Sequence, residues 1–111
     1  MPFEFGDVIL VRFPFTNLAA DKQRPAVVVS SSAYNASKPD VVVLAITSQI
    51  RLAARLGEVW IDEWQLANLL KPSVIKPVFA TLEQSLIIRR LGTLQSQDQS
   101  SLRNAIAEVI G

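Results

Sequence analysis

The segment at residues 22–30 (Lys-Gln-Arg-Pro-Ala-Val-Val-Val-Ser) constrains the fold of this chain more than any other. Its three consecutive valines are stiff, β-branched side chains that favour a buried strand. Pro25 cannot donate to a sheet ladder, so it belongs at the first residue of that strand. Because a proline biases the preceding residue toward an extended backbone, Arg24 is expected at the mouth of a loop. Binding and catalytic residues often occupy such positions, although surface arginines that only cap a strand do so too.

Together with that segment, other short apolar runs give six predicted strands, over residues 6–13, 24–31, 41–47, 58–61, 73–81 and 86–94. The first and third of these runs are apolar on both faces. The first two are predicted to pair as an antiparallel hairpin. Residues 18–23 and 32–39 are predicted as loops, and residues 62–70 as a stretch with a helical turn. Pro77 predicts an edge position or a bulge in its strand.

The end of the chain predicts a helix. Ser96 followed three residues later by Gln99 is typical of a capping box, and Gly111 ends the pattern. Five apolar side chains fall on one helical face, which we expect to pack against the core: Leu102, Ala105, Ile106, Val109 and Ile110. The sequence therefore predicts a mainly β fold with a C-terminal helix (α+β), a small, strongly bent antiparallel sheet or barrel covered on one open side by the helix.

Composition limits the possible functions. The 111 residues suffice for one domain, residues 1–111, and carry 11 basic and 10 acidic side chains, a net charge of +1. Without cysteine or histidine, the chain has no disulfide framework, histidine acid–base pair or histidine-ligated metal site. No apolar run approaches the ~20 residues of a membrane helix, and the start does not read as a signal peptide. We therefore expect a cytoplasmic protein with no membrane partner.

Two predicted strand ends carry the candidate site. If the second and third strands are antiparallel neighbours, Arg24 and Thr47 converge, with Ser48 and Gln49 beside them. The planar guanidinium of arginine matches a phosphate with two parallel hydrogen bonds. Other cations in predicted loops or near strand ends, each unremarkable as a surface charge alone, are candidates to line an electropositive groove: Lys22, Arg51, Arg55, Lys71 and Lys76.

The order of motifs along nearly the whole chain resembles the PemK/MazF family, the toxins of bacterial type II toxin–antitoxin systems. The matching motifs are Gly-Asp-Val (6–8), the segment 24–30, Ala-Ile-Thr-Ser-Gln-Ile (45–50), Ser-Val-Ile-Lys (73–76) and Leu-Gly-Thr-Leu (91–94). The loop at residues 18–23 departs from the Glu- and Gly-containing loop of many members. The resemblance implies an SH3-like barrel of the CcdB/MazF type, a homodimer, and a cognate antitoxin as partner.

The resemblance also implies the chemistry. Arg24 and Thr47 match the catalytic residues of the family, and the RNA-binding set is expected to be Lys22, Ser48, Gln49, Arg51 and Lys76. The family cleaves single-stranded RNA without metal or other cofactor: the ribose 2′-hydroxyl attacks the phosphate, leaving a 2′,3′-cyclic phosphate and a 5′-hydroxyl. With a pKa of ~13, an arginine is a poor general base. We therefore expect Arg24 to stabilise charge, and the sequence names no base.

Two other functions fit the same fold. One is a gyrase-binding toxin of the CcdB branch, which engages gyrase through a Trp-Gly-Ile ending. This chain ends Glu-Val-Ile-Gly at residues 108–111, which argues against that function. The other is a catalytically silent barrel that only binds a partner protein. Incubating the protein with RNA in chelator separates these possibilities.

Overall fold

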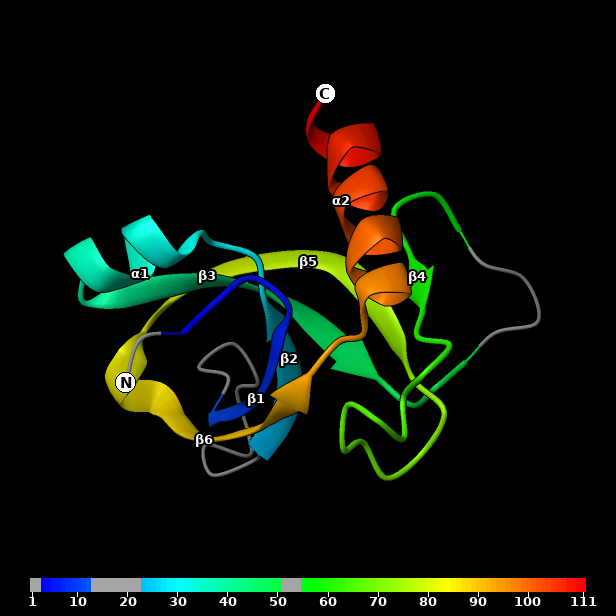
Figure 1. Cartoon of the computed structure of the whole chain (residues 1–111), viewed down its shortest axis with the longest axis horizontal. Helices are drawn as coiled ribbons and strands as arrows, with labels where there is room; N and C mark the ends of the chain where they lie inside the picture. The colour runs from blue at the N-terminus through cyan, green and yellow to red at the C-terminus, as the bar shows by residue number, and fades with distance from the viewer. Residues whose placement is uncertain (1–2, 13–22, 51–54) are drawn as a thin grey trace.

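The computed structural model describes residues 3–12, 23–50 and 55–111 (Figure 1). Six antiparallel strands form one sheet in the order β4-β5-β3-β2-β1-β6. The strands are β1 (Asp7–Arg12), β2 (Gln23–Val28), β3 (Asp40–Thr47), β4 (Val59–Trp60), β5 (Val74–Glu83) and β6 (Ile87–Thr93). The helices are α1 (Ser32–Ser37), the 3₁₀ turn η1 (Gln84–Leu86) and α2 (Ser96–Ile110). A bent antiparallel sheet with a C-terminal helix confirms the predicted fold.

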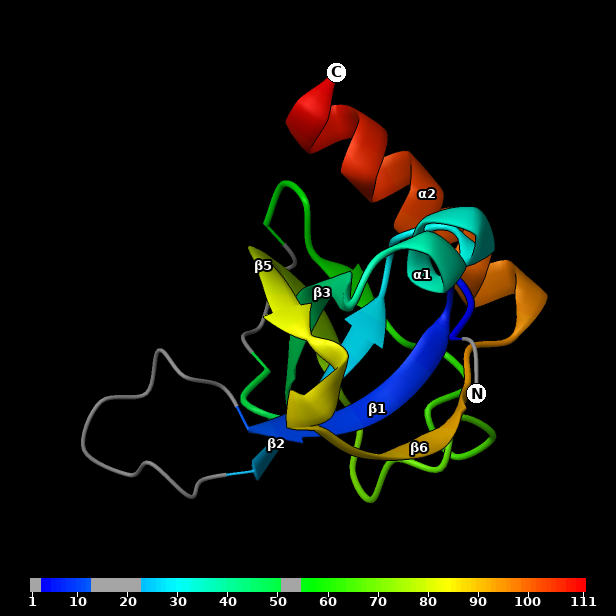
Figure 2. The same cartoon turned by 90° about the vertical axis from the view of Figure 1, so that its left-hand side faces the viewer.

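The central strands are buried on both faces, as their apolar runs predicted. Val8, Val27 and Leu44 belong to a cluster that packs against α2, whereas Ile9 and Val28 alternate with them and belong to a second cluster. Figure 2 shows that the sheet is strongly bent, with β1 and β6 curving beneath β3 and β5. The two clusters lie on its two faces. The hairpin of the first two strands is also confirmed, with Val8 opposite Val27.

Pro77 lies in an irregular part of β5. Leu44 pairs with Phe79 and Ile46 pairs with Ile75, so residues 76–78 oppose the single residue Ala45. The missing N–H of the proline therefore breaks no regular ladder. The predicted bulge at Pro77 is confirmed.

The start of α2 differs from the prediction. Gln95, not Ser96, is the N-cap residue, and the Gln99 side chain donates to the Leu94 carbonyl at 2.8 Å. The predicted capping box was therefore wrong, because Ser96 already lies inside the helix. Instead Asp98, 1% exposed, accepts hydrogen bonds from the backbone N–H groups of Asp62 and Glu63 at 3.0 Å each.

The apolar stripe of α2 is only partly core. Leu102 and Ala105 are buried, but Val109 and Ile110 are 43% and 66% exposed. Figure 1 shows the reason, since the last turns of α2 extend beyond the sheet. The prediction that the whole stripe packs on the core was wrong for this end. Within the described residues, no helix has the length and apolar character needed to cross a membrane.

The predicted loop at residues 32–39 was wrong over most of its length, because α1 occupies Ser32–Ser37. Its N-cap is Ser31, whose hydroxyl accepts from the Tyr34 N–H at 3.2 Å. Asn35 is buried and donates to the Phe3 and Ser30 carbonyls at 2.7 and 3.2 Å. Polar side chains and long-range hydrogen bonds hold this short helix, so apolar periodicity gave no signal for it.

Candidate functional site

A cavity of about 550 Å³ lies where β2 begins and β3 ends. Ala26 and Ala45 form the outermost described pair of this ladder, and Arg24 and Thr47 lie two residues farther out on the two strands. Both residues line the cavity, together with Pro25 of β2. The antiparallel pairing of β2 and β3 thus brings the two predicted site residues to one place.

Arg24 and Thr47 each keep hydrogen-bonding capacity. Arg24 is half-buried, and its Nε is buried without a hydrogen-bond partner among the described residues. The Thr47 Oγ1 accepts from the backbone N–H of Gln49 at 3.1 Å. Because a hydroxyl both accepts and donates, its hydrogen remains available to a ligand oxygen.

The other predicted RNA-binding residues fall into three groups. Ser48 and Gln49 are exposed and line the cavity. Lys76 does not line it: its Nζ lies 3.4 Å from the Glu58 carboxylate, beside β4. Lys22 and Arg51 lie outside the described residues.

Glu58, the ion-pair partner of Lys76, has a shifted pKa. The pKa of Glu58 is lowered below its usual 4.5, first because the Arg55 backbone N–H donates to the carboxylate (3.0 Å) and then because Lys76 lies beside it. The surroundings of the Glu58 carboxylate therefore stabilise its negative charge. Lys76 is one of these stabilising partners, so we interpret its contact with Glu58 as a structural ion pair.

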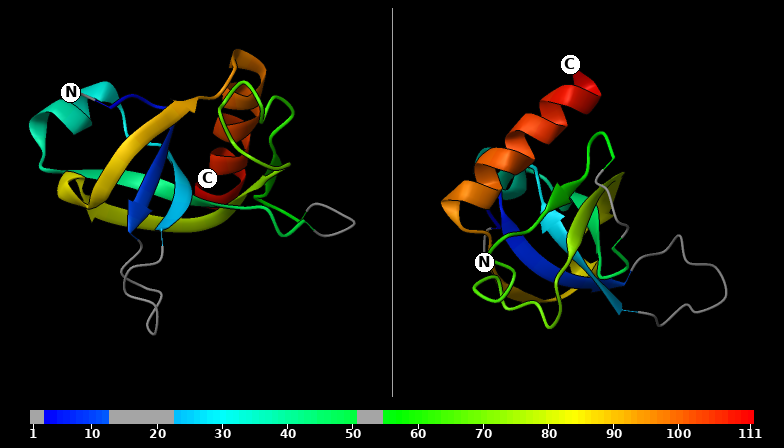
Figure 3. Two further views of the ribbon diagram at one scale, coloured as in Figure 1. Left: turned by 90° about the horizontal axis from the view of Figure 1, so that it is seen from below. Right: turned by 90° about the vertical axis from the view of Figure 1, so that its right-hand side faces the viewer.

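The cavity has a second wall that the sequence analysis did not predict. The 61–73 segment, which links β4 to β5, contributes Asn68, Leu70 and Lys71, and β6 contributes Arg89 and Leu91. Figure 3 shows this segment beside the start of α2 and the end of β6. Lys71 was only one of several loop cations in the sequence, and Arg89 had no signal that distinguished it from Arg90.

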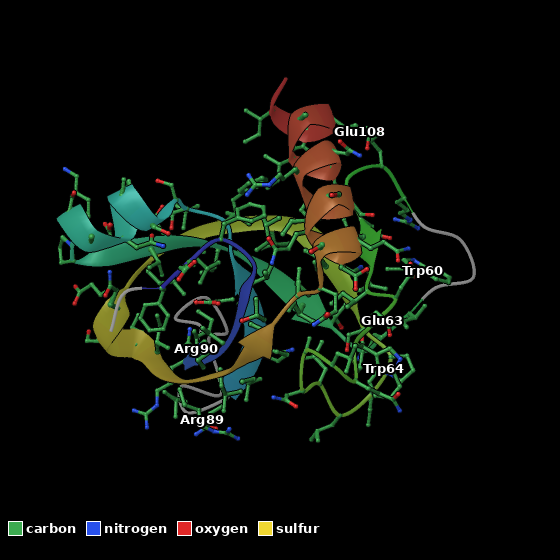
Figure 4. All side chains as sticks on the ribbon, in the orientation of Figure 1. Trp60, Glu63, Trp64, Arg89, Arg90 and Glu108 are labelled. Atoms are coloured by element: carbon green, nitrogen blue, oxygen red, sulfur yellow. The ribbon has the colours of Figure 1, made fainter. Side chains whose placement is uncertain are left out.

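Arg89 and Arg90 point to opposite sides of β6, as neighbouring strand residues do (Figure 4). Arg89 pairs with Leu10 of β1, and both line the cavity. Arg90 instead donates to the buried carboxylate of Asp7 at 3.3 Å. Of these two neighbouring arginines, Arg89 therefore lines the cavity and Arg90 forms an ion pair within the fold.

The charge of the cavity is one-sided. Arg24, Lys71 and Arg89 line it, and none of its described lining residues is acidic. Three cations without a carboxylate favour an anionic ligand. Among the described residues, no group of three or more acidic side chains is placed to hold a metal ion. The arrangement therefore suits a phosphate-containing ligand.

A larger cavity, about 710 Å³, lies between α2 and the N-terminal segment. Glu4 and Arg103 both line it, and the Arg103 guanidinium stacks 3.8 Å from the centre of the Phe5 ring. Its charges are mixed, and it contains none of the predicted site residues. The smaller cavity is therefore the candidate site.

The fold is shared with solved toxin structures of low sequence identity. An endoribonuclease from a mycobacterial species, solved with its cognate antitoxin, superposes with a TM-score of 0.80 at 20% identity, covering 98% of this chain and 95% of that one. Mycobacterium tuberculosis toxin MazF-mt6 gives 0.76 at 22% identity, covering 94% and 95%. A MazE–MazF structure from Deinococcus radiodurans gives 0.78 at 18% identity, covering 100% and 97%. These likenesses establish the fold alone.

No curated protein matches the sequence significantly. A family model, however, matches residues 4–110, nearly the whole chain. Its description is PemK-like, MazF-like toxin of type II toxin–antitoxin system. The chain belongs to this toxin family.

Proposed function

We propose that this toxin is an endoribonuclease that cleaves single-stranded RNA at the cavity between β2 and β3. The observation that carries the proposal is the convergence of Arg24 and Thr47 on a cavity whose described lining residues include three cations and no acidic side chain. A phosphodiester is the anion that best fits a bidentate guanidinium beside a hydroxyl donor. One of the structural neighbours is itself an endoribonuclease, in agreement with this activity.

The proposed reaction uses a nucleophile from the substrate. The ribose 2′-oxygen attacks the adjacent phosphorus, the bond from phosphorus to the 5′-oxygen breaks, and the products are a 2′,3′-cyclic phosphate and a 5′-hydroxyl. The 2′-hydroxyl gives up its proton to a base that remains unassigned, and the leaving oxygen gains one. Because the attacking group is part of the RNA, the reaction requires no metal or other cofactor and spares DNA.

Arg24 and Thr47 act on the phosphate in this proposal. Arg24 clamps the scissile phosphate and stabilises the charge that develops on its oxygens, an effect of about 3–4 kcal/mol for one such donor. Thr47 donates its free hydroxyl hydrogen to the same oxygens. Ser48 and Gln49 lie next to Thr47 and contact the nucleotides on either side, in keeping with their exposure at the rim.

The proposed partners follow from the family and from the surface. One structural neighbour was solved in complex with its cognate antitoxin and another as MazE–MazF, so we expect an antitoxin here as well. We expect its acidic segment to cover the cationic cavity and compete with RNA. Trp60, Leu56 and Val109 are exposed apolar side chains of the kind that a homodimer would cover. The cytoplasm, where mRNA and antitoxin meet, is the proposed location.

The test is cleavage of single-stranded RNA by purified protein in excess chelator, with analysis of the product ends. We expect cleavage, a cyclic phosphate on the 5′ fragment and a hydroxyl on the 3′ fragment. An absolute requirement for Mg²⁺, or products with 3′-hydroxyl ends, would defeat the mechanism. Inhibition of gyrase with no RNA cleavage would replace the function itself.

A further inference from the structure

We propose that three residues of the second wall of the cavity bind the nucleotide next to the scissile phosphate: Leu70 and Lys71 of the 61–73 segment and Arg89 of β6. This subsite rests on the proposed endoribonuclease function and adds a substrate contact to it. Lys71 and Arg89 bind the phosphate of that nucleotide, and Leu70 contacts its base.

The 61–73 segment is irregular but firmly held at both ends. At its start, the buried Asp98 carboxylate accepts the N–H groups of Asp62 and Glu63, at 3.0 Å each. At its end, the Ser73 carbonyl accepts the Ile61 N–H at 3.1 Å, and the Ser73 hydroxyl donates to the Lys71 carbonyl at 2.8 Å. Leu69 between these anchors is buried in the core. The neighbouring Leu70 and Lys71 are therefore held in place without regular secondary structure, as a selective subsite requires.

The segment is also pressed against β6. Asn68 has a φ of 62°, a left-handed conformation that asparagine tolerates better than most residues, and its Nδ2 donates to the Leu91 carbonyl at 2.7 Å. A Cβ at Gly92 would lie 2.7 Å from the Ala67 carbonyl oxygen, so only glycine allows this approach. These contacts bring Leu70 and Lys71 into the same cavity wall as Arg89 and explain the glycine in the Leu-Gly-Thr-Leu motif.

The exposed groups of this wall match a nucleotide. Leu70 is 94% exposed although its neighbour Leu69 is buried, and it lines the same cavity as the two cations. Neither Lys71 nor Arg89 has a salt-bridge partner among the described residues. An apolar surface beside unmatched positive charge fits a flat base joined to a phosphate better than it fits water or an apolar peptide.

The first experiment measures binding of a short single-stranded RNA that spans a cleavage site mapped with the wild-type protein. A 2′-O-methyl group at the scissile nucleotide prevents its cleavage. Affinity is measured by fluorescence anisotropy over a range of salt concentrations. Lys71→Ala and Arg89→Ala should each reduce the slope of log affinity against log salt by about 0.7, as expected when one phosphate contact to a single strand is lost. Lys38→Ala, on an exposed cation outside the cavity, should leave the slope unchanged.

The second experiment tests the base contact. Leu70→Ser should weaken binding about five- to tenfold, since it removes apolar contact area, and should leave the salt slope as it was. Leu66→Ser is the matched control, because Leu66 lies on the same segment and is 59% exposed but does not line the cavity. At one nucleotide flanking the scissile phosphate, removing the base should abolish the effect of Leu70→Ser.

The outcomes separate the subsite from the function. If the wild-type protein cleaves and binds RNA while all three variants retain its affinity and salt slope, the subsite is wrong and the proposed function stands. If the loss of RNA affinity from Leu70→Ser adds to the loss from base removal at every flanking position, Leu70 contacts none of these bases and the proposed base contact is wrong. If the wild-type protein neither binds nor cleaves RNA, the function and the subsite fall together.

Discussion

Two groups of cations in the described part of the chain occupy contrasting environments. Arg90 and Lys76 each face a shielded carboxylate, Asp7 and Glu58, at 3.3 and 3.4 Å. Arg24, Lys71 and Arg89 line a cavity that has no acidic lining residue among those described. The contrast is sharpest between Arg89 and Arg90, which are adjacent in sequence and lie on opposite sides of one strand (Figure 4).

The difference separates cations that neutralise carboxylates within the fold from cations whose charge no described acidic lining residue neutralises. Asp7 also accepts hydrogen bonds from the Glu4 N–H at 2.9 Å and the Thr93 hydroxyl at 3.0 Å, so its site is well satisfied within the protein. Clustered cations without acidic partners repel one another, and stability alone does not favour them. A ligand that brings negative charge removes this cost. Substitutions in the cavity group should therefore affect RNA, and substitutions in the paired group should affect the stability of the fold.

The largest effect is expected at Arg24. Arg24→Ala should lower the rate of RNA cleavage by roughly 10²- to 10³-fold, the scale for loss of one transition-state donor. Arg24→Lys should recover little of it, because a point charge cannot reproduce the bidentate fork. Rates come from single-turnover cleavage of a labelled RNA. Near-normal cleavage by Arg24→Ala would make this arginine a structural residue and remove the main support for the contrast.

Thr47 should follow with a smaller effect. Thr47→Ala should slow cleavage about 10- to 100-fold, the range for loss of one hydrogen bond to a charged group. Thr47→Ser keeps the hydroxyl and should retain most activity in the same assay. If the alanine and serine variants lose activity equally, the methyl group and not the hydroxyl matters, and the proposed donor is wrong.

Arg90→Ala should affect the fold and not the RNA. It leaves the buried Asp7 without one of its partners, which should reduce the free energy of unfolding by about 1–3 kcal/mol. Urea denaturation measures this loss, and RNA affinity of the folded variant should match wild type. Arg89→Ala is the matched control, with unchanged unfolding free energy and weaker RNA binding. The reverse pattern would show that the two arginines have been assigned to the wrong roles.

Substitution of Glu58, the partner of Lys76, should have a small effect on stability, and this effect should depend on pH. Because the pKa of Glu58 is lowered in the folded state, its contribution to stability is present above its ordinary value of 4.5. That contribution is lost as pH falls through the lowered folded-state value. The drop in melting temperature between neutral and acidic pH should therefore be smaller in Glu58→Gln than in wild type. Identical pH profiles would argue that the Glu58 carboxylate, with its Arg55 and Lys76 partners, does not stabilise the fold.

Much of the fold was predictable because its determinants are local. The valine runs gave the buried strands, and Pro77 marked the bulge in β5. The two strand ends at Arg24 and Thr47 could be placed together because antiparallel pairing fixes which ends meet.

The second wall could not be predicted in the same way. The position of the 61–73 segment depends on Asp98, which is distant in sequence, and on the close approach of Ala67 to Gly92. The pairing of β1 with β6 shifts register on either side of Ile9 and Leu10, so strand alternation alone could not assign Arg89 and Arg90 to their faces. Lys76 was grouped with the RNA-binding residues because its partner Glu58 is apparent only in the fold.

The most direct test of the proposed activity uses a DNA oligonucleotide with a single ribonucleotide at the mapped cleavage site. The protein is incubated with it in excess chelator. We expect one cut at the ribonucleotide, a cyclic phosphate on the 5′ product, and no cut in the all-DNA strand or with Arg24→Ala. Cleavage of the all-DNA strand, or no cleavage of the chimeric strand until Mg²⁺ is added, would contradict the central claim, which is that the 2′-hydroxyl of the RNA is the nucleophile and no metal is required.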